Sequence, residues 1–457
     1  MCCSIRIGGE PNGTRTFLLI WFGQLVSVLG SGLTSFGVGV YIFQKTHSAT
    51  AFSVTTLAYS LPLVLCTPFA GVLVDRWSRR RAMMVSDLGA GSCSLALALL
   101  VMAGRLQIWE IYVLIACSSA FASLMWPAFL ASMTVLVPKR HLGRANGLLQ
   151  GAEATSMILA PVLGATLMAF SGLRALVIAD VASFVVSVSC LAVARVPAPA
   201  VRKESKSAED FSFDQLSFGF RYILARRGLL TLLAFFFGVN LTAGVVTTLW
   251  TPLMLTVFNT ATLARVMGCM GFGMLGGTVA MSIWGGPPKR VYGVLVPGVI
   301  TGLGISAVCL PGGWIYYATV ATLFMFCMPI MGGCSQAIWQ VKVPPDLQGR
   351  VFAARRTIAS CSAPMAMALA GPLADRLFNP GMMPGGRLAP IFGFVGAGPG
   401  AGIRVLFLLA GITVAAFAVG VLLSPRVRNV ETELPDYSVL GDEVDAAAPV
   451  FLQATDS

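Results

Sequence analysis

Charged residues are scarce in this chain. Asp, Glu, Lys and Arg together make up 11% of its 457 residues, against roughly 25% in ordinary soluble domains. Hydrophobic residues make up 56% and recur in long runs. This composition excludes a soluble protein held by one anchor and predicts an all-α polytopic membrane protein. The first run, from about residue 16 to residue 43, is too long for the apolar part of a signal peptide and is predicted to be the first span.

Patterns typical of enzymes and metal sites are also lacking. The two histidines, His47 and His141, fall in predicted loops on opposite sides of the membrane. The 11 cysteines are scattered, without CxxC or Cys/His spacing, so neither a metal site nor a disulfide framework is predicted. A Gly-Lys-Ser/Thr phosphate loop does not occur, which argues against direct coupling to ATP. We therefore expect no cofactor, and an enzyme or a sensor is the least supported class.

The net charge of +12 would suggest nucleic acid as a partner if the protein were soluble. Here the basic residues sit in short segments beside hydrophobic runs, where lipid headgroups and topology account for them, so no nucleic-acid partner is expected. If about twelve spans alternate from a cytoplasmic N-terminus, the basic residues on the outer side are Lys45, Arg105, Arg174, Arg265, Arg376, Arg387 and Arg404. All the others lie inside. The sequence thus predicts a multi-pass protein of the cell (inner) membrane with both termini cytoplasmic.

The chain divides into two similar halves. Residues 1–196 and 228–425 each hold six predicted spans, and the cytoplasmic linker at 197–227 has in its second part the spacing of an amphipathic helix. The acidic tail at 426–457 lacks apolar periodicity and is expected to be disordered. The segment from Val137-Pro138 to Gly143-Arg144 is echoed 206 residues later, from Val343-Pro344 to Gly349-Arg350. An echo at the same place in each half indicates a transporter built from parallel repeats.

A short basic connection joins the second and third hydrophobic runs. It reads Gly71-Val-Leu-Val-Asp75-Arg76-Trp-Ser-Arg79-Arg80-Arg81. It resembles the loop 2–3 motif of the major facilitator superfamily, G-x-L-x-D-R-x-G-R-[RK], with Ser78 in place of the last glycine. The resemblance implies a twelve-helix fold and a cytoplasmic gate in which the acid and the arginines clamp helix ends of both halves. The predicted gate residues are Gly71, Asp75, Arg76, Arg79 and Arg80.

Other segments resemble the drug and siderophore exporters of this superfamily, which include macrolide efflux proteins and the enterobactin exporter. These segments are Gly23-Gln24-Leu-Val-Ser27, Trp126-Pro127-Ala-Phe, residues 137–150, 349–356 and 370–376. Relatives encoded beside peptide-synthetase assembly lines look most similar. Ala160-Pro161-Val-Leu-Gly164 is similar to the antiporter motif G-P-x-x-G, and a contact between small residues of two helices is the alternative explanation.

Two acids deep within predicted spans are candidate proton-coupling residues, because charges inside the bilayer are costly and usually mark function. Glu153 shares a helical face with Asn146 and Gln150. That face is expected to line a water-filled cavity, where Glu153 exchanges a proton or meets a cationic substrate; pairing with a neighbouring helix is the alternative. Asp180 is either a coupling site or a hydrogen-bond partner between helices.

Two further acids lie closer to the ends of spans. Asp87 is the third proton-coupling candidate, although an ion pair with Arg79–Arg81 or with Arg355 and Arg356 is the preferred explanation. Asp375 is expected at the outer mouth of the eleventh span. There a salt bridge to Arg376 or the capping of a helix is a better explanation than a direct part in transport.

Polar residues recur along single faces of several spans and predict a substrate cavity. The predicted cavity residues are Gln24, Ser27, Ser31, Ser123, Trp126, Gln150, Asn240, Gln336 and Gln340. Hydroxyl side chains also join membrane helices by hydrogen bonds, so each position has a structural alternative.

Together these patterns predict a secondary active exporter of amphipathic small molecules, such as a drug, a macrolide, a siderophore or a peptide product. Proton antiport with alternating access is the expected mechanism. An importer or a lysophospholipid translocator of the same fold is the alternative. The expected partners are the substrate, protons and membrane lipid, and the protein is expected to be a monomer.

Overall fold

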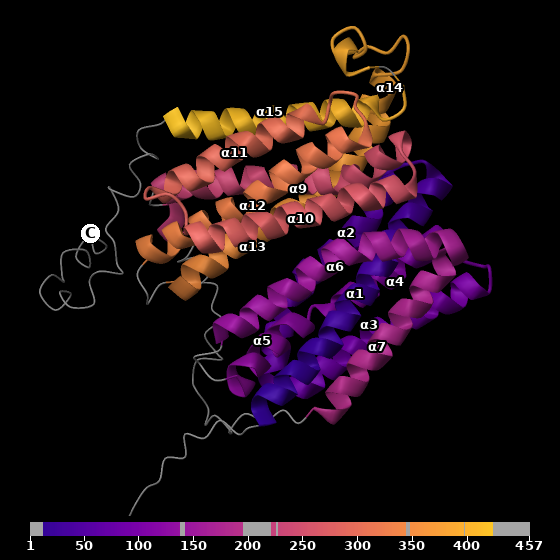
Figure 1. The fold of residues 1–457 in the computed structure, drawn as a ribbon, viewed down its shortest axis with the longest axis vertical. Helices are drawn as coiled ribbons and strands as arrows, with labels where there is room; N and C mark the ends of the chain where they lie inside the picture. Colours follow the sequence, from indigo (N-terminus) through magenta and orange to yellow (C-terminus); the bar gives the residue numbers. More distant parts are fainter. Residues whose placement is uncertain are drawn as a thin grey trace, which may run out of the picture.

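The computed structural model describes residues 12–137, 142–194, 221–224, 227–343, 348–396 and 398–423. Most of the linker at 197–227, with its predicted amphipathic helix, and the tail at 426–457 lie outside the described residues. Within the described residues the regular elements are helices, which form two groups lying side by side in Figure 1. One group runs from indigo to magenta and the other from pink through orange to yellow, so each group is one half of the chain. The all-α prediction is confirmed.

The first group, here called the N-terminal half, contains seven described helices. They are α1 (Asn12–Thr46), α2 (Ala49–Arg76), α3 (Arg79–Met102), α4 (Ile108–Ala122), α5 (Met125–Leu136), α6 (Leu142–Ser171) and α7 (Leu173–Val193). Ser48 and Ser78 accept hydrogen bonds at the N-termini of α2 and α3, which explains where these two helices begin.

The second group is here called the C-terminal half. Its long helices are α9 (Arg227–Val257), α10 (Thr260–Trp284), α11 (Arg290–Ala307), α12 (Trp314–Lys342), α13 (Gln348–Pro372) and α15 (Ala401–Leu423). Short elements connect α13 to α15: the π-helix η2 (Leu373–Phe378), α14 (Asn379–Gly381) and the 3₁₀-helix η3 (Gly393–Val395).

Eleven described segments are long and apolar enough to cross a membrane, and α4 and α5 together count as one of them. Helix α13 has the length of a span, at 25 residues, but it contains Arg350, Arg355 and Arg356 and falls outside this set. It nevertheless packs between α9 and α2, inside the helix bundle. With α13 included, the described helices match the twelve spans predicted from the sequence.

The fourth span is broken between α4 and α5. Pro127 lies in the first turn of α5 and has no N–H to donate to the carbonyl of Ser123, four residues earlier. Ser123 Oγ donates instead to the Ala120 carbonyl at 2.7 Å. From α3, Ser86 Oγ donates to the Phe121 carbonyl at 2.9 Å. Side-chain hydroxyls therefore supplement the backbone hydrogen bonds around the break.

The duplication seen in the sequence is also present in the backbone. Val137 follows α5 with φ −108° and ψ 126°, and Val343 follows α12 with φ −114° and ψ 127°. Each valine precedes a proline, which favours this extended conformation. Helices α6 and α13 then begin at Leu142 and Gln348, again 206 residues apart. The echoed segments therefore open equivalent helices of the two halves.

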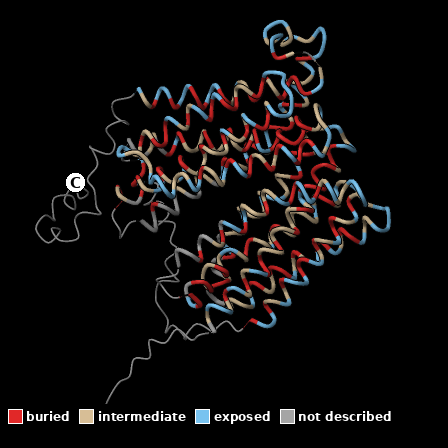
Figure 2. Tube along the Cα trace, viewed as in Figure 1, coloured by how far each residue is buried: buried red, intermediate tan, exposed pale blue. Residues whose placement is uncertain are grey.

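Each half has its own packed interior, and Figure 2 shows buried residues running along the helices within both groups. In the C-terminal half, α11 and α15 approach each other at Gly302 and Gly411. A Cβ atom on Gly302 would lie 2.6 Å from the Ala415 nitrogen, so only glycine permits this approach. Close backbone contact of this kind is a main source of helix association in lipid, where the hydrophobic effect contributes little.

Candidate functional site

Asp375 joins the two halves at the end of the molecule where α1 leads into α2. Its carboxylate accepts a hydrogen bond from Ser48 Oγ at 2.7 Å, and from the backbone N–H groups of Ala49 and Thr50 at 3.2 and 2.7 Å. A carboxylate is stabilised at a helix N-terminus by the free N–H groups and by the helix dipole. Of the two expectations for Asp375, helix capping is confirmed. The capped helix belongs to the opposite half of the chain.

Helices α2 and α13 also touch directly next to this cap. A Cβ atom on Gly371 would lie 2.6 Å from Thr50 Cα and 2.8 Å from Ser53 Cβ, so the contact requires glycine. Two turns farther along α2, Ser60 Oγ lies 3.0 Å from the Met367 sulfur. On the other side of the bundle, Gly271 of α10 packs against Ile158 of α6 in the same way. These contacts between the halves lie toward the α1–α2 end, which we call the joined end.

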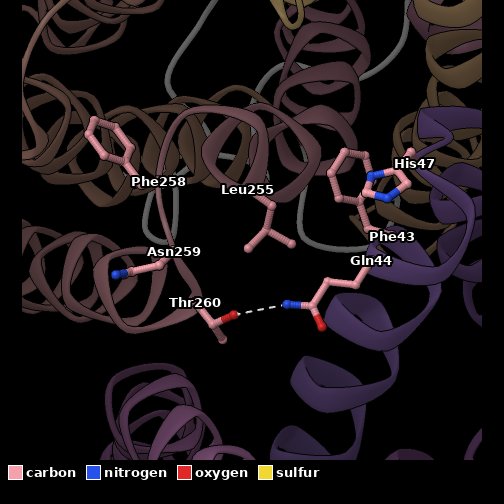
Figure 3. Close-up of a pocket in the computed structure, with 7 residues that line it drawn as sticks. All are labelled: Phe43, Gln44, His47, Leu255, Phe258, Asn259 and Thr260. Atoms are coloured by element: carbon pink, nitrogen blue, oxygen red, sulfur yellow. Dashed lines mark hydrogen bonds between the residues drawn. The ribbon is translucent and has the colours of Figure 1, made fainter.

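A small pocket of about 140 Å³ also lies at the joined end, between α1 and the turn from α9 to α10 (Figure 3). It is lined by Phe43, Gln44, His47, Leu255, Phe258, Asn259 and Thr260. Gln44 Nε2 donates to Thr260 Oγ1 at 3.3 Å across the two halves, as Figure 3 shows. The pocket is therefore part of the contact between the halves.

A larger pocket of about 360 Å³ lies between α9 and α13. Its lining residues are Asn240, Ala243, Gly244 and Thr247 of α9, and Ala359, Ser362, Ala363 and Met367 of α13. Small side chains on both helices leave the space, and the amide and hydroxyl groups give its wall a few neutral polar points. Asn240, one of the predicted cavity residues, is among them. We call this space the α9–α13 pocket.

Glu153 is exposed on α6. By the 206-residue offset it is the counterpart of Ala359, which lines the α9–α13 pocket. It also precedes Ile158, the cross-half contact, by five residues, or about 7 Å along the helix away from the joined end. Tyr59 of α2, likewise exposed, lies within electrostatic range of Glu153. The exposed carboxylate thus lies beyond the Gly271–Ile158 contact, on the side away from the joined end.

Arg355 of α13 is bound to α12. Its Nη1 group donates to Gln336 Oε1 at 3.0 Å and its Nη2 group to Ser335 Oγ at 3.1 Å. Its guanidinium carbon lies 5.0 Å from the centre of the Trp339 ring, a cation–π contact. Arg355 precedes Ala359 by four residues, so the two share a face of α13. Sequence reasoning placed Gln336 in the cavity but gave Arg355 no part in it.

Asp87 is buried in α3 among neutral donors. Its Oδ2 atom accepts hydrogen bonds from Gln24 Nε2 at 3.0 Å and from Ser187 Oγ at 2.6 Å. These partners come from α1 and α7, so the carboxylate links three helices. The expected ion pair with Arg79 or Arg355 is wrong, because the carboxylate faces into the N-terminal half, whereas Arg355 is bound to α12 in the other half.

Asp180 is likewise buried among neutral donors. It lies closer to the joined end than Asp87 does. Its Oδ1 atom accepts from Ser31 Oγ of α1 at 3.2 Å, and its Oδ2 atom accepts from Ser94 Oγ of α3 at 2.7 Å. Only 2% of the residue is exposed. Of the two alternatives for Asp180, the hydrogen bond between helices is the one formed in this structure.

The polar stripe on α1 therefore differs from the cavity prediction. Gln24 and Ser31 are bonded to the two buried aspartates, and Ser27 is 5% exposed. Helix α1 packs along α7, so the stripe faces the interior of its own half instead of a space between the halves. Hydroxyl and amide side chains on one face show that a helix has a polar neighbour, but not which neighbour it is.

The basic connection between α2 and α3 is attached to α7. Arg80 Nε donates to the Leu191 carbonyl at 2.9 Å, and its Nη2 group donates to the Ala192 carbonyl in the last turn of α7. A cation at a helix C-terminus complements the helix dipole. Ser78, the departure from the superfamily motif, is the N-cap of α3 and accepts from the Arg81 N–H at 3.3 Å. This turn is therefore firmly tied to the N-terminal half.

The remaining predicted residues belong either to the cytoplasmic gate or to the substrate cavity. Gly71, Asp75 and Arg76 lie in the last turns of α2 and Arg79 opens α3, whereas Gln150 and Gln340 lie on α6 and α12. Apart from Arg79, their side chains are outside the described set. Trp126 is 39% exposed on α5, and Ser123 is buried at the break before it.

The segment similar to the antiporter motif forms a close contact between α1 and α6. A Cβ atom on Gly32 would lie 2.8 Å from Ala160 Cβ, and one on Gly164 would lie 2.8 Å from a Phe36 ring carbon. The small residues at positions 160 and 164 thus let the two helices pack closely. Groups of three or more residues suited to hold a metal ion do not occur among the described residues.

The sequence profile of the major facilitator superfamily matches residues 20–368. The chain belongs to this superfamily. The resemblance noted in the sequence is thereby confirmed, and so is the expectation that this multi-pass membrane protein is a transporter and not an enzyme. The major facilitator fold also explains why the two halves repeat each other at a constant offset.

Two named relatives of this major facilitator chain are efflux proteins. Macrolide efflux protein A of Streptococcus pyogenes is 26% identical over 372 residues, covering 80% of this chain and 91% of that protein. Multidrug efflux pump Tap of Mycolicibacterium fortuitum is 23% identical over 432 residues, covering 91% of this chain and 97% of the pump. The alignment with each relative thus extends over most of both chains.

Solved structures confirm the fold. A bacterial homologue of the human lysosomal transporter Spinster, in an inward-facing and unoccupied conformation, matches with a TM-score of 0.70 at 13% identity. It covers 93% of this chain and 99% of its own. A bacterial homologue of the iron transporter ferroportin, in an inward-facing state, matches with a TM-score of 0.64 at 14% identity, covering 89% and 99%. At these identities the likeness concerns architecture alone.

Proposed function

We propose that this transporter is a secondary active exporter of amphipathic small molecules and that proton exchange at Glu153 drives it. The observation that carries the proposal is the place of Glu153. It is exposed on α6 beyond the contact between the halves, at the position equivalent to a residue of the α9–α13 pocket. A carboxylate within a span that faces open space can take up and release a proton, which a paired, enclosed one does not do readily.

The orientation follows from the distribution of charge. Lys45, Arg265, Arg376 and the other few basic residues assigned to the outer side lie near the joined end, so this end is proposed to face outward and both termini the cytoplasm. The structure then corresponds to an inward-facing state, with the outer ends of the halves closed. Two fold neighbours are in inward-facing states, so this state is one that the fold can adopt.

The contacts suggest how the states interconvert. Outward opening requires α2 and α13 to separate, which breaks the three hydrogen bonds to Asp375. Closure of the cytoplasmic end is proposed to bring helix ends of the C-terminal half against the gate residues Gly71, Asp75, Arg76, Arg79 and Arg80. Because Arg80 is bound to the end of α7, that turn moves with the whole N-terminal half as a rigid unit.

Asp87 and Asp180 are retained as further proton-coupling candidates. Both carboxylates are buried and are contacted by neutral donors, so the charge of their ionised forms would lack a direct counter-ion among these contacts. Protonation at either site would change the hydrogen bonds among α1, α3 and α7. Their role is therefore proposed to be indirect, through the packing of the N-terminal half.

The substrate class is inferred from the pocket and the relatives. The wall of the α9–α13 pocket combines apolar atoms of Ala243, Ala363 and Met367 with the neutral groups of Asn240 and Ser362. Pockets of this type bind by shape and apolar contact, with few fixed polar pairs. The named relatives export macrolides and several drugs, which agrees with an amphipathic substrate.

Uptake of a radiolabelled macrolide by cells that express the chain tests this proposal. We expect expression to lower accumulation, and an uncoupler of the proton gradient to abolish the difference. Glu153→Gln removes the titratable group and should reduce export at least tenfold while the protein level stays unchanged. Glu110→Gln is the matched control, because Glu110 is an acid in the first turn of α4 that bonds only to the adjacent turn.

Two results would contradict the proposal in different ways. A rise in accumulation on expression would indicate import. Transport by Glu153→Gln with unchanged dependence on pH would remove Glu153 from the coupling mechanism. If macrolide accumulation does not change but labelled lysophospholipid moves between leaflets, the lipid translocator is the correct assignment.

A further inference from the structure

Arg355 lies within helix α13 of the bundle. All of its described partners are neutral. Two of its donor groups are bonded to Gln336 and Ser335, and its face is covered by the Trp339 ring. Within the described part of the chain, these contacts include no carboxylate. A guanidinium in a membrane protein interior is costly and usually marks a functional site.

The three partners fix the orientation of the guanidinium without neutralising it. They occupy consecutive turns of α12, at positions 335, 336 and 339, and Trp339 is itself fully buried. Arginine has five N–H donors in a planar fork, and these contacts use two of them. The geometry therefore leaves a positively charged edge that is held in place and able to bind an anion in a bidentate manner.

This charged group adjoins the α9–α13 pocket. Arg355, Ala359 and Ser362 follow the spacing i, i+4 and i+7 on α13, and the last two line the pocket. Arg355 is thus one helical turn from the pocket, on the side away from the joined end. Gln336, to which it is bonded, is exposed, so the group borders open space. The pocket wall itself is otherwise neutral.

We propose that Arg355 binds the anionic group of the substrate, a carboxylate or a phosphate, while the apolar part of the same molecule occupies the α9–α13 pocket. This inference rests on the proposed transport of amphipathic molecules and narrows their class to acidic ones. The Gln336 amide and the Ser335 hydroxyl position the guanidinium. The Trp339 ring covers one face of the guanidinium, and the N–H groups that Gln336 and Ser335 do not use are the ones that would bind the anion.

A binding measurement tests this without depending on the direction or coupling of transport. The probe is 11-(dansylamino)undecanoic acid, an amphipathic fluorescent carboxylate, and its neutral methyl ester is the comparison. The purified protein is placed in nanodiscs of phosphatidylcholine. We expect the acid to bind about 10- to 100-fold more tightly than the ester, as charge-assisted hydrogen bonds imply. Arg355→Gln should remove this preference and leave the affinity for the ester unchanged.

Two variants serve as controls. Arg265→Gln removes an arginine that has similar contacts, namely a tryptophan ring at 5.0 Å and a hydroxyl at 3.0 Å. Arg265 lies at the joined end, far from the α9–α13 pocket. It should retain the full preference for the acid. Arg355→Lys keeps the charge but not the fork, so it should retain part of the preference and also show that the site tolerates substitution.

Several outcomes overturn the inference. They are equal binding of acid and ester by the unmodified protein, an equal loss of both in Arg355→Gln, and the same loss of preference in Arg265→Gln.

Repeating the titration in nanodiscs with phosphatidylglycerol separates the two sources of anion, the lipid headgroup and the free substrate. Competition that is present in the parent protein and absent in Arg355→Gln assigns the site to lipid headgroups. Retained binding of the acid assigns it to a free substrate. If cells that express the chain export neither the macrolide nor the dansylated acid, but acid binding depends on Arg355, the proposed export is wrong and this site stands.

Discussion

The two halves share one topology and both contain close glycine contacts, but the N-terminal half adds buried carboxylates to them. In the N-terminal half, the buried carboxylates of Asp87 and Asp180 connect α1, α3 and α7 through hydroxyl and amide donors. In the C-terminal half, α11 and α15 meet backbone to backbone at Gly302 and Gly411. Since lipid tails are as apolar as leucine, helices in a membrane associate through one or the other of these contacts.

The difference extends to the distribution of charge. The described residues of the C-terminal half contain one acid, Asp375, and it is bonded to α2 of the other half. The N-terminal half holds Glu153 and the two buried aspartates. Duplication thus preserved the helices while the halves acquired different chemistry. In the proposed mechanism, the N-terminal half handles protons and the C-terminal half supplies a glycine-packed frame with a cation for the substrate.

The largest effect is expected in the glycine contact of the C-terminal half. A side chain at position 302 would strike the nitrogen and Cα of Ala415, at 2.6 and 2.9 Å from its Cβ, and backbone atoms cannot rotate away. Gly302→Val should therefore destabilise the protein by about 3 kcal/mol, the upper end of typical overpacking costs. Thermal unfolding in detergent measures this. Gly420→Val, on α15 and with nothing within 4 Å of the added Cβ, should unfold like the parent protein. Equal loss in both variants would contradict the account.

A smaller effect is expected at the carboxylates of the N-terminal half. Asp180→Ala removes the acceptor of the half-buried Ser31 and the buried Ser94 hydroxyls, which should cost about 2 kcal/mol. Asp180→Asn keeps an acceptor oxygen and should cost roughly half as much. The same thermal unfolding assay ranks the two variants. Ser92→Ala is the control, because Ser92 is exposed and bonds within its own helix. An unchanged unfolding temperature in Asp180→Ala would show that the N-terminal half does not depend on this carboxylate.

The smallest effect on stability is expected at Asp375, the acid that acts between the halves. Asp375→Ala removes a charged helix cap worth about 1 kcal/mol, so it should shift the equilibrium between states roughly fivefold toward separation of the joined end. Spin-label distances between positions 45 and 261, both exposed at that end, report this shift. Arg376→Gln changes the adjacent exposed charge and should leave the distances unchanged. A shift of equal size in both variants would assign the effect to net charge and not to the cap.

Much of the fold could be predicted from the sequence, because span length and the echoed segments are local properties. The 206-residue offset between Val137 and Val343 reappears in backbone conformation and in the start of α6 and α13. The broken fourth span was not predicted, although Pro127 is its cause. A proline interrupts a hydrogen-bond ladder, but hydropathy alone does not register the break.

The sites were less predictable, because they depend on which helices become neighbours. The α1 stripe of Gln24 and Ser31 was correctly taken as a polar face, yet its partners are aspartates on α3 and α7 and not a cavity. Asp375 caps a helix 325 residues away in the chain, a distance no local pattern can bridge. Arg355 was considered only as a topological charge and as an ion-pair partner for Asp87, since its significance depends on the Gln336 amide and the pocket beside it.

The composition of α13 has a consequence for biogenesis. An arginine costs about 2.5–3.5 kcal/mol at the centre of an isolated helix during insertion by the translocon, and α13 carries Arg350 in its first turn and Arg355 and Arg356 in its third. This helix therefore cannot settle stably in lipid by itself when it leaves the ribosome. It needs α12, which binds Arg355, and α9 and α2, against which it packs, to be in the membrane first. The C-terminal half thus completes its assembly late, and a nascent chain that lacks those partners exposes a marginal segment to membrane quality-control proteases.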